Sequence, residues 1–178
     1  VHGVLVVELG VDLEVPLVGV MVEVPAAVYQ AREFARRVGF LSVGSNDLTQ
    51  YLLAVDRNNA RVADIYQAYH PAVLQALQKV VVDGHAEGRK VGICGELAGD
   101  PAAAILLTAM GYDILSMNAT NLPRVKLVLR SISMVRAREL LQQVMAMESA
   151  GQIQAFMEAV LIETGVQQLV RPQVAELA

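Results

Sequence analysis

Two acidic side chains stand at the ends of apolar segments that have the composition of buried β-strands. Glu23 closes the segment 18–23, and Asp47 follows the segment 40–44. A pair of carboxylates from neighbouring units is a ligand set that Mg²⁺ takes in proteins, often together with phosphate oxygens of a substrate. Either residue alone is explained as well by a helix cap or a turn. The pair at matching strand ends favours a metal site.

A carboxamide and a guanidinium lie close to Asp47 in the chain. Asn46 precedes it directly, and Arg57 follows ten residues later. Arg57 has the planar fork of donors that binds phosphate, and the Asn46 amide can donate to a phosphate or a carboxylate. The alternatives are a surface ion pair for Arg57 and a helix N-cap for Asn46.

Cys94 is the only cysteine, and it lies in the glycine-flanked segment VGICGELAGD at 91–100. Glycines allow a ligand to approach the backbone closely. A thiol with an ordinary pKa near about 8.5 can pass its proton to a carbanion-like intermediate. The alternative is an inert core residue, which is the usual role of a lone cysteine on an apolar strand.

The three histidines are not spaced as metal ligands. His2 is terminal, His70 precedes Pro71, and His85 lies late in an expected helix. We therefore expect structural or surface roles for all of them.

Strands and helices alternate along most of the chain. Four short segments are apolar on both faces, as in a covered parallel sheet, and each precedes an amphipathic helical pattern. The expected strands are 18–23, 40–44, 91–94 and 114–117, and the expected helices run from Pro25 to Arg37, from Pro71 to Glu87, from Pro101 to about Gly111, and onward from Asn121 as N-cap. This order predicts an α/β fold with right-handed crossovers.

The polar residues follow the carboxyl ends of these expected strands. They are Glu23, Asn46 with Asp47, Cys94 with Glu96, and Asn118. In a (β/α) barrel such positions line the active face, and in an open sheet they line the crevice at the strand ends. Both arrangements predict that these side chains converge.

The pattern becomes wholly helical after Ser131. It predicts a terminal extension with helices at 133–149 and 152–164, broken near Gly151. We interpret its leucines and methionines as core, with a dimer surface as the alternative. The chain is therefore divided into an α/β part, 1–132, and a helical extension of the same domain, 133–178.

Composition argues against several classes of protein. With 54% hydrophobic and 18% charged residues over 178 positions, the chain is expected to fold around a real core. A net charge of −4 without a basic stripe argues against nucleic acid as a partner. No uncharged run reaches the about 18 residues of a membrane span, and a single cysteine fits a reducing compartment such as the cytoplasm. The start VHGVLVVELG lacks signal-peptide features and an initiator Met, so we interpret the chain as a piece of a longer protein.

Four motifs together resemble the phosphoenolpyruvate-utilising enzymes. They are GVMVEVPAAV at 19–28, SVGSNDLTQYLLAVDRNN at 42–59, GICGELAGDP at 92–101 and LSMNATNLPRVK at 115–126. The resemblance covers roughly residues 15–130. It is strongest to enzyme I of the bacterial phosphotransferase system, the phosphoenolpyruvate-protein phosphotransferases. RNNARVADIY, SMNATNLPRVK and the helical tail look most like the nitrogen-branch paralogue.

This resemblance implies a fold and a set of roles. The fold is the second half of a phosphoenolpyruvate-binding (β/α)8 TIM barrel, with about four strand–helix units. The implied reaction moves the phosphoryl group of phosphoenolpyruvate to a histidine of an N-terminal domain and then to an HPr-like phosphocarrier protein. By resemblance, Glu23 and Asp47 ligate Mg²⁺, while Asn46 and Arg57 hold the phosphate. Cys94 protonates the enolate of pyruvate.

Only part of the family's machinery is represented here. The arginines of earlier strands and the phosphohistidine domain are missing, so the chain alone is expected to be inactive. A half barrel has unpaired strand edges and apolar surface, and the family dimerises through this domain, so we expect a homodimer. Two alternatives stay open. One is a fragment of an ATP-dependent pyruvate phosphate dikinase or phosphoenolpyruvate synthase, and the other is a non-catalytic ligand-binding or dimerisation module.

Overall fold

The computed structural model describes residues 16–165. Its centre is a parallel sheet in the order β1-β2-β3-β4, made of β1 (Gly19–Val22), β2 (Phe40–Gly44), β3 (Lys90–Cys94) and β4 (Ile114–Ser116). Neighbours in the sheet are also neighbours in the chain, so a helical crossover joins each pair. The predicted α/β arrangement is confirmed.

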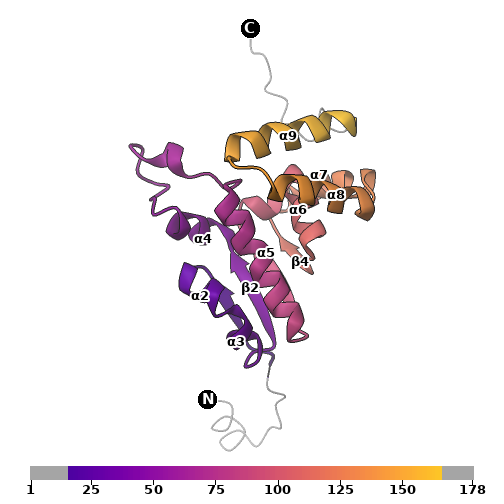
Figure 1. The fold of residues 1–178 in the computed structure, drawn as a ribbon. Coiled ribbons are helices and arrows are strands. Elements are labelled where there is room, and N and C mark those ends of the chain that lie inside the picture. Colours follow the sequence, from indigo (N-terminus) through magenta and orange to yellow (C-terminus); the bar gives the residue numbers. More distant parts are fainter. Residues whose placement is uncertain (1–15, 166–178) are drawn as a thin grey trace, which may run out of the picture.

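Helices cover one face of this sheet, with α5 in front of β2 and α6 to α9 gathered above β4 in this view (Figure 1). They are α2 (Pro25–Tyr29), α3 (Ala31–Ala35), α4 (Ser45–Leu52), α5 (Pro71–Ala86), α6 (Pro101–Met110), α7 (Leu122–Ser131), α8 (Met134–Met145) and α9 (Ala150–Glu163), with the short 3-10 helices η1 (Ala63–Ile65) and η2 (Leu97–Gly99). The predicted starts at Pro25, Pro71 and Pro101 are confirmed. Proline fits the first turn because its missing N–H has no partner there in any case.

Alternate residues of the two central strands lie on a face that helices cover. Leu41 and Val43 of β2 and Val91 and Ile93 of β3 are at most 1% exposed. Helix α5 packs against both strands. Burial of these branched side chains is the main source of stability for the sheet.

The opposite face of the sheet is not covered by any element within residues 16–165. Met21, Phe40 and Ile114 on this face are 46%, 39% and 56% exposed, and a cavity of about 260 Å³ lies over Ser42 and Gly92. The prediction that both faces are covered is therefore not met by the described residues. Small and apolar side chains on this face suit the interior of a barrel that further strands would close.

The predicted helix from Pro25 to Arg37 is instead two short helices. Gln30 leaves helical geometry, at φ −105° and ψ 11°, and separates α2 from α3. Val28 and Ala31 are buried on the two sides of this break. Because the hydrophobic period continues through the break, the sequence pattern does not reveal it.

Serine caps set the helix starts in the extension. The Ser133 hydroxyl accepts from the N–H of Arg136 at 3.2 Å, and the Ser149 hydroxyl accepts from the N–H of Gln152 at 3.3 Å. Such a cap is worth about 1 kcal/mol, comparable with the cost of about 1 kcal/mol for glycine inside a helix. The two predicted helices of the extension are confirmed, but the break between them lies at residues 146–149, and Gly151 is in the first turn of α9.

Helices α8 and α9 share the core of the α/β part. Both pack against α6, and Leu140, Ile153 and Met157 are completely buried in the same cluster as Leu106 of α6. No helix between residues 16 and 165 is long and apolar enough to cross a membrane. Residues 166–178 of the predicted extension lie outside the described residues.

Replacing Leu140 by alanine should lower the free energy of unfolding by about 2–5 kcal/mol, because it leaves a cavity under α8. Val135→Ala, at a position of α8 that is 69% exposed, should change it by less than about 0.5 kcal/mol. Urea titrations followed by circular dichroism measure both values. Equal effects of the two variants would show that α8 is not part of the cooperative core.

Candidate functional site

The strand register aligns a row of residues at the carboxyl ends of the strands. Gly44 of β2 pairs with Cys94 of β3, and Cys94 pairs with Ser116 of β4. The pairing of β1 with β2 places Glu23, one residue beyond β1, level with Gly44. Because side chains alternate along a strand, this row belongs to the open face of the sheet. The predicted metal ligand and the thiol therefore reach the same edge.

Gly44 leaves room for the Glu23 carboxylate. A Cβ atom at position 44 would lie 2.5 Å from Oε1 of Glu23 and 2.7 Å from its Cγ. Side-chain carbons do not approach other atoms so closely in packed proteins. The Glu23 side chain therefore lies over the end of β2, on the side of Cys94, and any side chain at position 44 would displace it.

Two carboxylates act on the Cys94 thiol. Burial is the largest cause that raises the pKa of the thiol, and the negative charges of Glu23 and Asp47 raise this pKa further. A negative charge near a thiol disfavours the thiolate, so both carboxylates favour the protonated form. At neutral pH the thiol is therefore protonated, which suits a proton donor better than a nucleophile.

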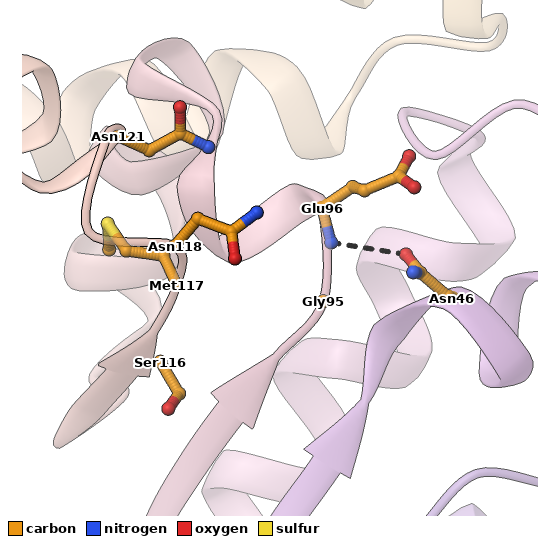
Figure 2. A pocket seen from close by; sticks show the side chains of 7 residues that line it. All are labelled: Asn46, Gly95, Glu96, Ser116, Met117, Asn118 and Asn121. Carbon is orange, nitrogen blue, oxygen red and sulfur yellow. Dashed lines mark hydrogen bonds between the residues drawn. The ribbon is translucent and has the colours of Figure 1, made fainter.

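Two hydrogen bonds tie the end of β3 to the start of α4. The Ser45 hydroxyl, 1% exposed, donates to the carbonyl oxygen of Cys94 at 2.8 Å. The N–H of Glu96 donates to Oδ1 of Asn46 at 3.2 Å (Figure 2). Gly95, between them in the chain, has φ 105°, a left-handed conformation that glycine adopts without strain. The loop that carries Cys94 and the turn that carries Asn46 are thus held together.

Asn46 lies inside the first turn of α4 and does not cap the helix. The helix begins at Ser45, Gly44 occupies the cap position, and no side chain caps it. The N-cap alternative for Asn46 is therefore wrong. Asp47 lies in the same first turn, where the helix dipole stabilises a negative charge.

A polar pocket of about 450 Å³ opens beside Asn46 (Figure 2). Its wall consists of side chains and backbone from the ends of β3 and β4 and from α4, namely Asn46, Gly95, Glu96, Ser116, Met117, Asn118 and Asn121. Small-molecule sites commonly measure about 300–1,000 Å³. Asn118, which the sequence placed after the fourth strand, extends from the β4 side toward the β3 loop. Asn121 occupies the N-cap position of α7, as predicted, but its side chain makes no capping hydrogen bond.

Arg57 lies in the exposed segment between α4 and α5. Its backbone N–H donates to Oε1 of Gln50 at 3.3 Å. Burial raises the pKa of the Tyr66 hydroxyl, and the Arg57 guanidinium beside that hydroxyl acts in the opposite direction. The hydroxyl of Tyr66 lies 3.5 Å from Oδ1 of Asn46. Arg57 therefore reaches the neighbourhood of Asn46 from the side of Tyr66.

Two of the histidines make hydrogen-bond contacts that do not involve the residues at the carboxyl ends of the strands. His70 accepts a hydrogen bond at Nδ1 from the N–H of Ala72, at the start of α5, at 3.2 Å. Nε2 of His85 lies 3.0 Å from Oδ2 of Asp113. His2 lies outside the described residues.

Sequence reasoning did not single out Ser116 or Tyr66. Ser116 ends the fourth strand, and the register of the sheet would have placed it in the row with Cys94. Tyr66 has no comparable signal, because an irregular segment of the chain brings it to Asn46 from twenty residues away.

The donor set at this edge fits a hard divalent cation. Among residues 16–165 no three His, Cys, Asp or Glu side chains form a metal-binding group, and the candidate ligands are carboxylate oxygens of Glu23 and Asp47. Zn²⁺ needs three or four protein ligands, whereas Mg²⁺ takes one or two carboxylates and completes its shell with water and substrate phosphate. The residues present therefore fit Mg²⁺.

The reactivity of Cys94 should report the two carboxylates. Its alkylation by iodoacetamide should follow an apparent pKa above that of an ordinary thiol. Glu23→Gln and Asp47→Asn should each lower this pKa and speed alkylation at neutral pH, because each removes a negative charge near the sulfur. Since the chain has one cysteine, the modified fraction gives the rate directly by mass spectrometry.

A matched control is Glu33→Gln, which neutralises a half-exposed carboxylate on α3 that pairs with Arg36. It should leave the alkylation profile unchanged. If Glu23→Gln and Asp47→Asn also leave it unchanged, the carboxylates do not act on Cys94.

Comparison with known proteins matches residues 7–134 to the family described as PEP-utilising enzyme, PEP-binding domain. The chain is 46% identical over 154 residues to the "Phosphoenolpyruvate-dependent phosphotransferase system" protein of Salmonella typhimurium strain LT2, covering 84% of this chain and 21% of that protein. It is 43% identical over 149 residues to the "Phosphoenolpyruvate-protein phosphotransferase" of Haemophilus influenzae, covering 84% and 26%. It is 44% identical over 151 residues to "Multiphosphoryl transfer protein 1" of Escherichia coli K12, covering 85% and 18%.

The chain spans about a fifth to a quarter of the length of these curated relatives. The resemblance inferred from the four motifs is confirmed for the family, and the parallel strand–helix units agree with the second half of its barrel followed by helices. The chain belongs to the phosphoenolpyruvate-utilising enzymes, and the segment 7–134 is part of their phosphoenolpyruvate-binding domain.

Proposed function

We propose that this chain carries part of the catalytic site of a phosphoenolpyruvate-protein phosphotransferase. The observation that carries the proposal is the convergence of Glu23 and Asp47 on the Cys94 thiol at one edge of the sheet. The names of the relatives support the same activity for the longer proteins to which the chain is similar.

Phosphate binding is assigned to Asn46 and Arg57. Asn46 has its carboxamide oxygen engaged by the N–H of Glu96, which leaves the amide group to donate to an anion. Arg57 is exposed and brings a positive charge to the same side of the site. Together they orient the phosphoryl group and offset part of its charge, and such positioning is the main contribution of a protein to phosphoryl transfer.

Metal binding is assigned to Glu23 and Asp47. A bound Mg²⁺ would neutralise charge on the phosphate and on the enolate oxygen. With a cation held by Glu23 and Asp47, their contribution to the raised pKa of Cys94 would be smaller, while the effect of burial would remain.

Proton transfer is assigned to Cys94. When the bond between phosphorus and the enol oxygen breaks, its electron pair remains on the oxygen and creates the enolate of pyruvate. The methylene carbon of this enolate takes the proton from Sγ of Cys94, and pyruvate forms. The thiol suits this step because its raised pKa keeps it protonated at neutral pH.

The remaining steps of the proposal need parts of the protein beyond these residues. The phosphoryl group passes to a histidine of an N-terminal domain and then to an HPr-like phosphocarrier protein, in the cytoplasm and within a homodimer. The motifs favour the nitrogen-branch paralogue. Since the sheet has an open face among the described residues, the 178-residue chain alone is expected to be inactive.

The test is a phosphoryl-transfer assay with the full-length protein that contains this sequence. It supplies labelled phosphoenolpyruvate, Mg²⁺ and a phosphocarrier, and no nucleotide. Label should reach a histidine of the carrier. Cys94→Ala and Asp47→Ala should each lower the rate by about 10²-fold or more, because they remove the proton donor and a metal ligand. Removal of Mg²⁺ with a chelator should stop the transfer.

The control variant is Glu139→Gln, which neutralises a surface carboxylate of α8 that pairs with Arg136. It should leave transfer unchanged. Label that appears only with nucleotide would favour a dikinase or synthase. No label under either condition would favour a non-catalytic module, for which the exposed Met21, Phe40 and Ile114 offer an assembly surface.

A further inference from the structure

Tyr66 is a half-buried aromatic residue that the preceding assignment does not use. It follows η1 in the segment between α4 and α5. Its hydroxyl lies 3.5 Å from the carbonyl oxygen of Asn46 and 3.5 Å from Oδ1 of the same residue. A side chain from the irregular segment between α4 and α5 thus reaches the residue assigned to bind phosphate.

The contacts of Asn46 fix which way its carboxamide faces. The N–H of Glu96 is only a donor, so the atom that it meets at 3.2 Å is the amide oxygen. The Tyr66 hydroxyl has one proton, which it can donate to this oxygen or to the backbone carbonyl oxygen of Asn46, each at 3.5 Å. With Oδ1 accepting from the N–H of Glu96 and facing the Tyr66 hydroxyl, Nδ2 is left for an acceptor outside this group.

The surroundings of the Tyr66 hydroxyl keep it a donor. Burial raises its pKa above the ordinary value of 10.0, while the neighbouring Thr49 hydroxyl and Arg57 act in the opposite direction and Glu96 raises it slightly. The phenol is therefore neutral at physiological pH. Thr49, on the next turn of α4, is completely buried and lies near the Tyr66 hydroxyl.

We infer that Tyr66 is a positioning residue, which holds the Asn46 carboxamide so that Nδ2 points at the phosphate of the substrate. This inference rests on the proposed function, because it deepens the role given there to Asn46. It differs from a packing role, in which the aromatic ring would only anchor the segment between α4 and α5. The two roles separate when the hydroxyl is removed and the ring is kept.

The test measures the affinity of the full-length protein that contains this sequence for two ligands, in the presence of Mg²⁺. One ligand is phosphoenolpyruvate. The other is oxalate, a planar dianion that resembles the enolate of pyruvate and has no phosphate. Tyr66→Phe should weaken the binding of phosphoenolpyruvate by about threefold to tenfold, the usual effect of one lost hydrogen bond, and leave oxalate within about twofold.

The matched control is Tyr69→Phe, which removes the hydroxyl of a tyrosine three residues further on. That hydroxyl donates to Oδ1 of Asp100 at 2.9 Å, at the start of α6. Loss of the Tyr69 hydroxyl can lower the stability of the fold, but both ligands should bind with the affinity of the wild-type protein. A second measurement repeats Tyr66→Phe in an Asn46→Ala background, where its effect on phosphoenolpyruvate should disappear.

Several outcomes would overturn the inference. Unchanged affinity for phosphoenolpyruvate in Tyr66→Phe, or an equal loss for both ligands, would make Tyr66 a packing residue. An effect that persists in Asn46→Ala would show that Tyr66 does not act through Asn46. If the unchanged protein binds neither ligand, the proposed function fails, and the assignment of Tyr66 fails with it.

Discussion

The in-register pairing of four parallel strands is the constraint on which the whole site depends. Glu23, Asp47 and Cys94 come from different strand–helix units, and the backbone ladder is what brings their strand ends level. A slip by one residue would turn every strand side chain to the other face of the sheet. The buried side chains of β2 and β3 under α5 resist such a slip, because it would expose them to water. Packing of the buried strand residues under α5 thus sets the relative positions of the residues at the strand ends.

The same edge gathers negative charge that is unfavourable in the absence of a counter-ion. Two carboxylates lie close enough to act on one partly buried thiol. The first turn of α4 offsets part of this cost for Asp47 through the helix dipole. Glu23 is not in the first turn of a helix. Its carboxylate fits over the end of β2 because Gly44 has no side chain. Under the metal assignment proposed above, a bound cation would offset this repulsion.

Much of the fold follows from local chemistry in the sequence. The strand Phe40–Gly44 has the bounds that its apolar run predicts, and prolines mark the starts of α2, α5 and α6. The errors have local causes as well. The Ser149 cap starts α9 before Gly151, and the hydrophobic period hides the break at Gln30. The contact of Tyr66 with Asn46 could not be predicted from the sequence, because the segment that positions Tyr66 has no regular hydrophobic pattern.

The shared core of α6, α8 and α9 has a consequence for how such proteins exchange parts during evolution. A genetic crossover just after α7 would look natural, since the strand–helix alternation ends there. Such a crossover would combine α6 from one parent with α8 and α9 from the other. Leu140, Ile153 and Met157 would then pack against side chains with which they did not evolve. Viable recombinants should therefore inherit α6 through α9 as a block. The heritable unit of this domain is set by side-chain packing and extends past the last strand of its barrel half.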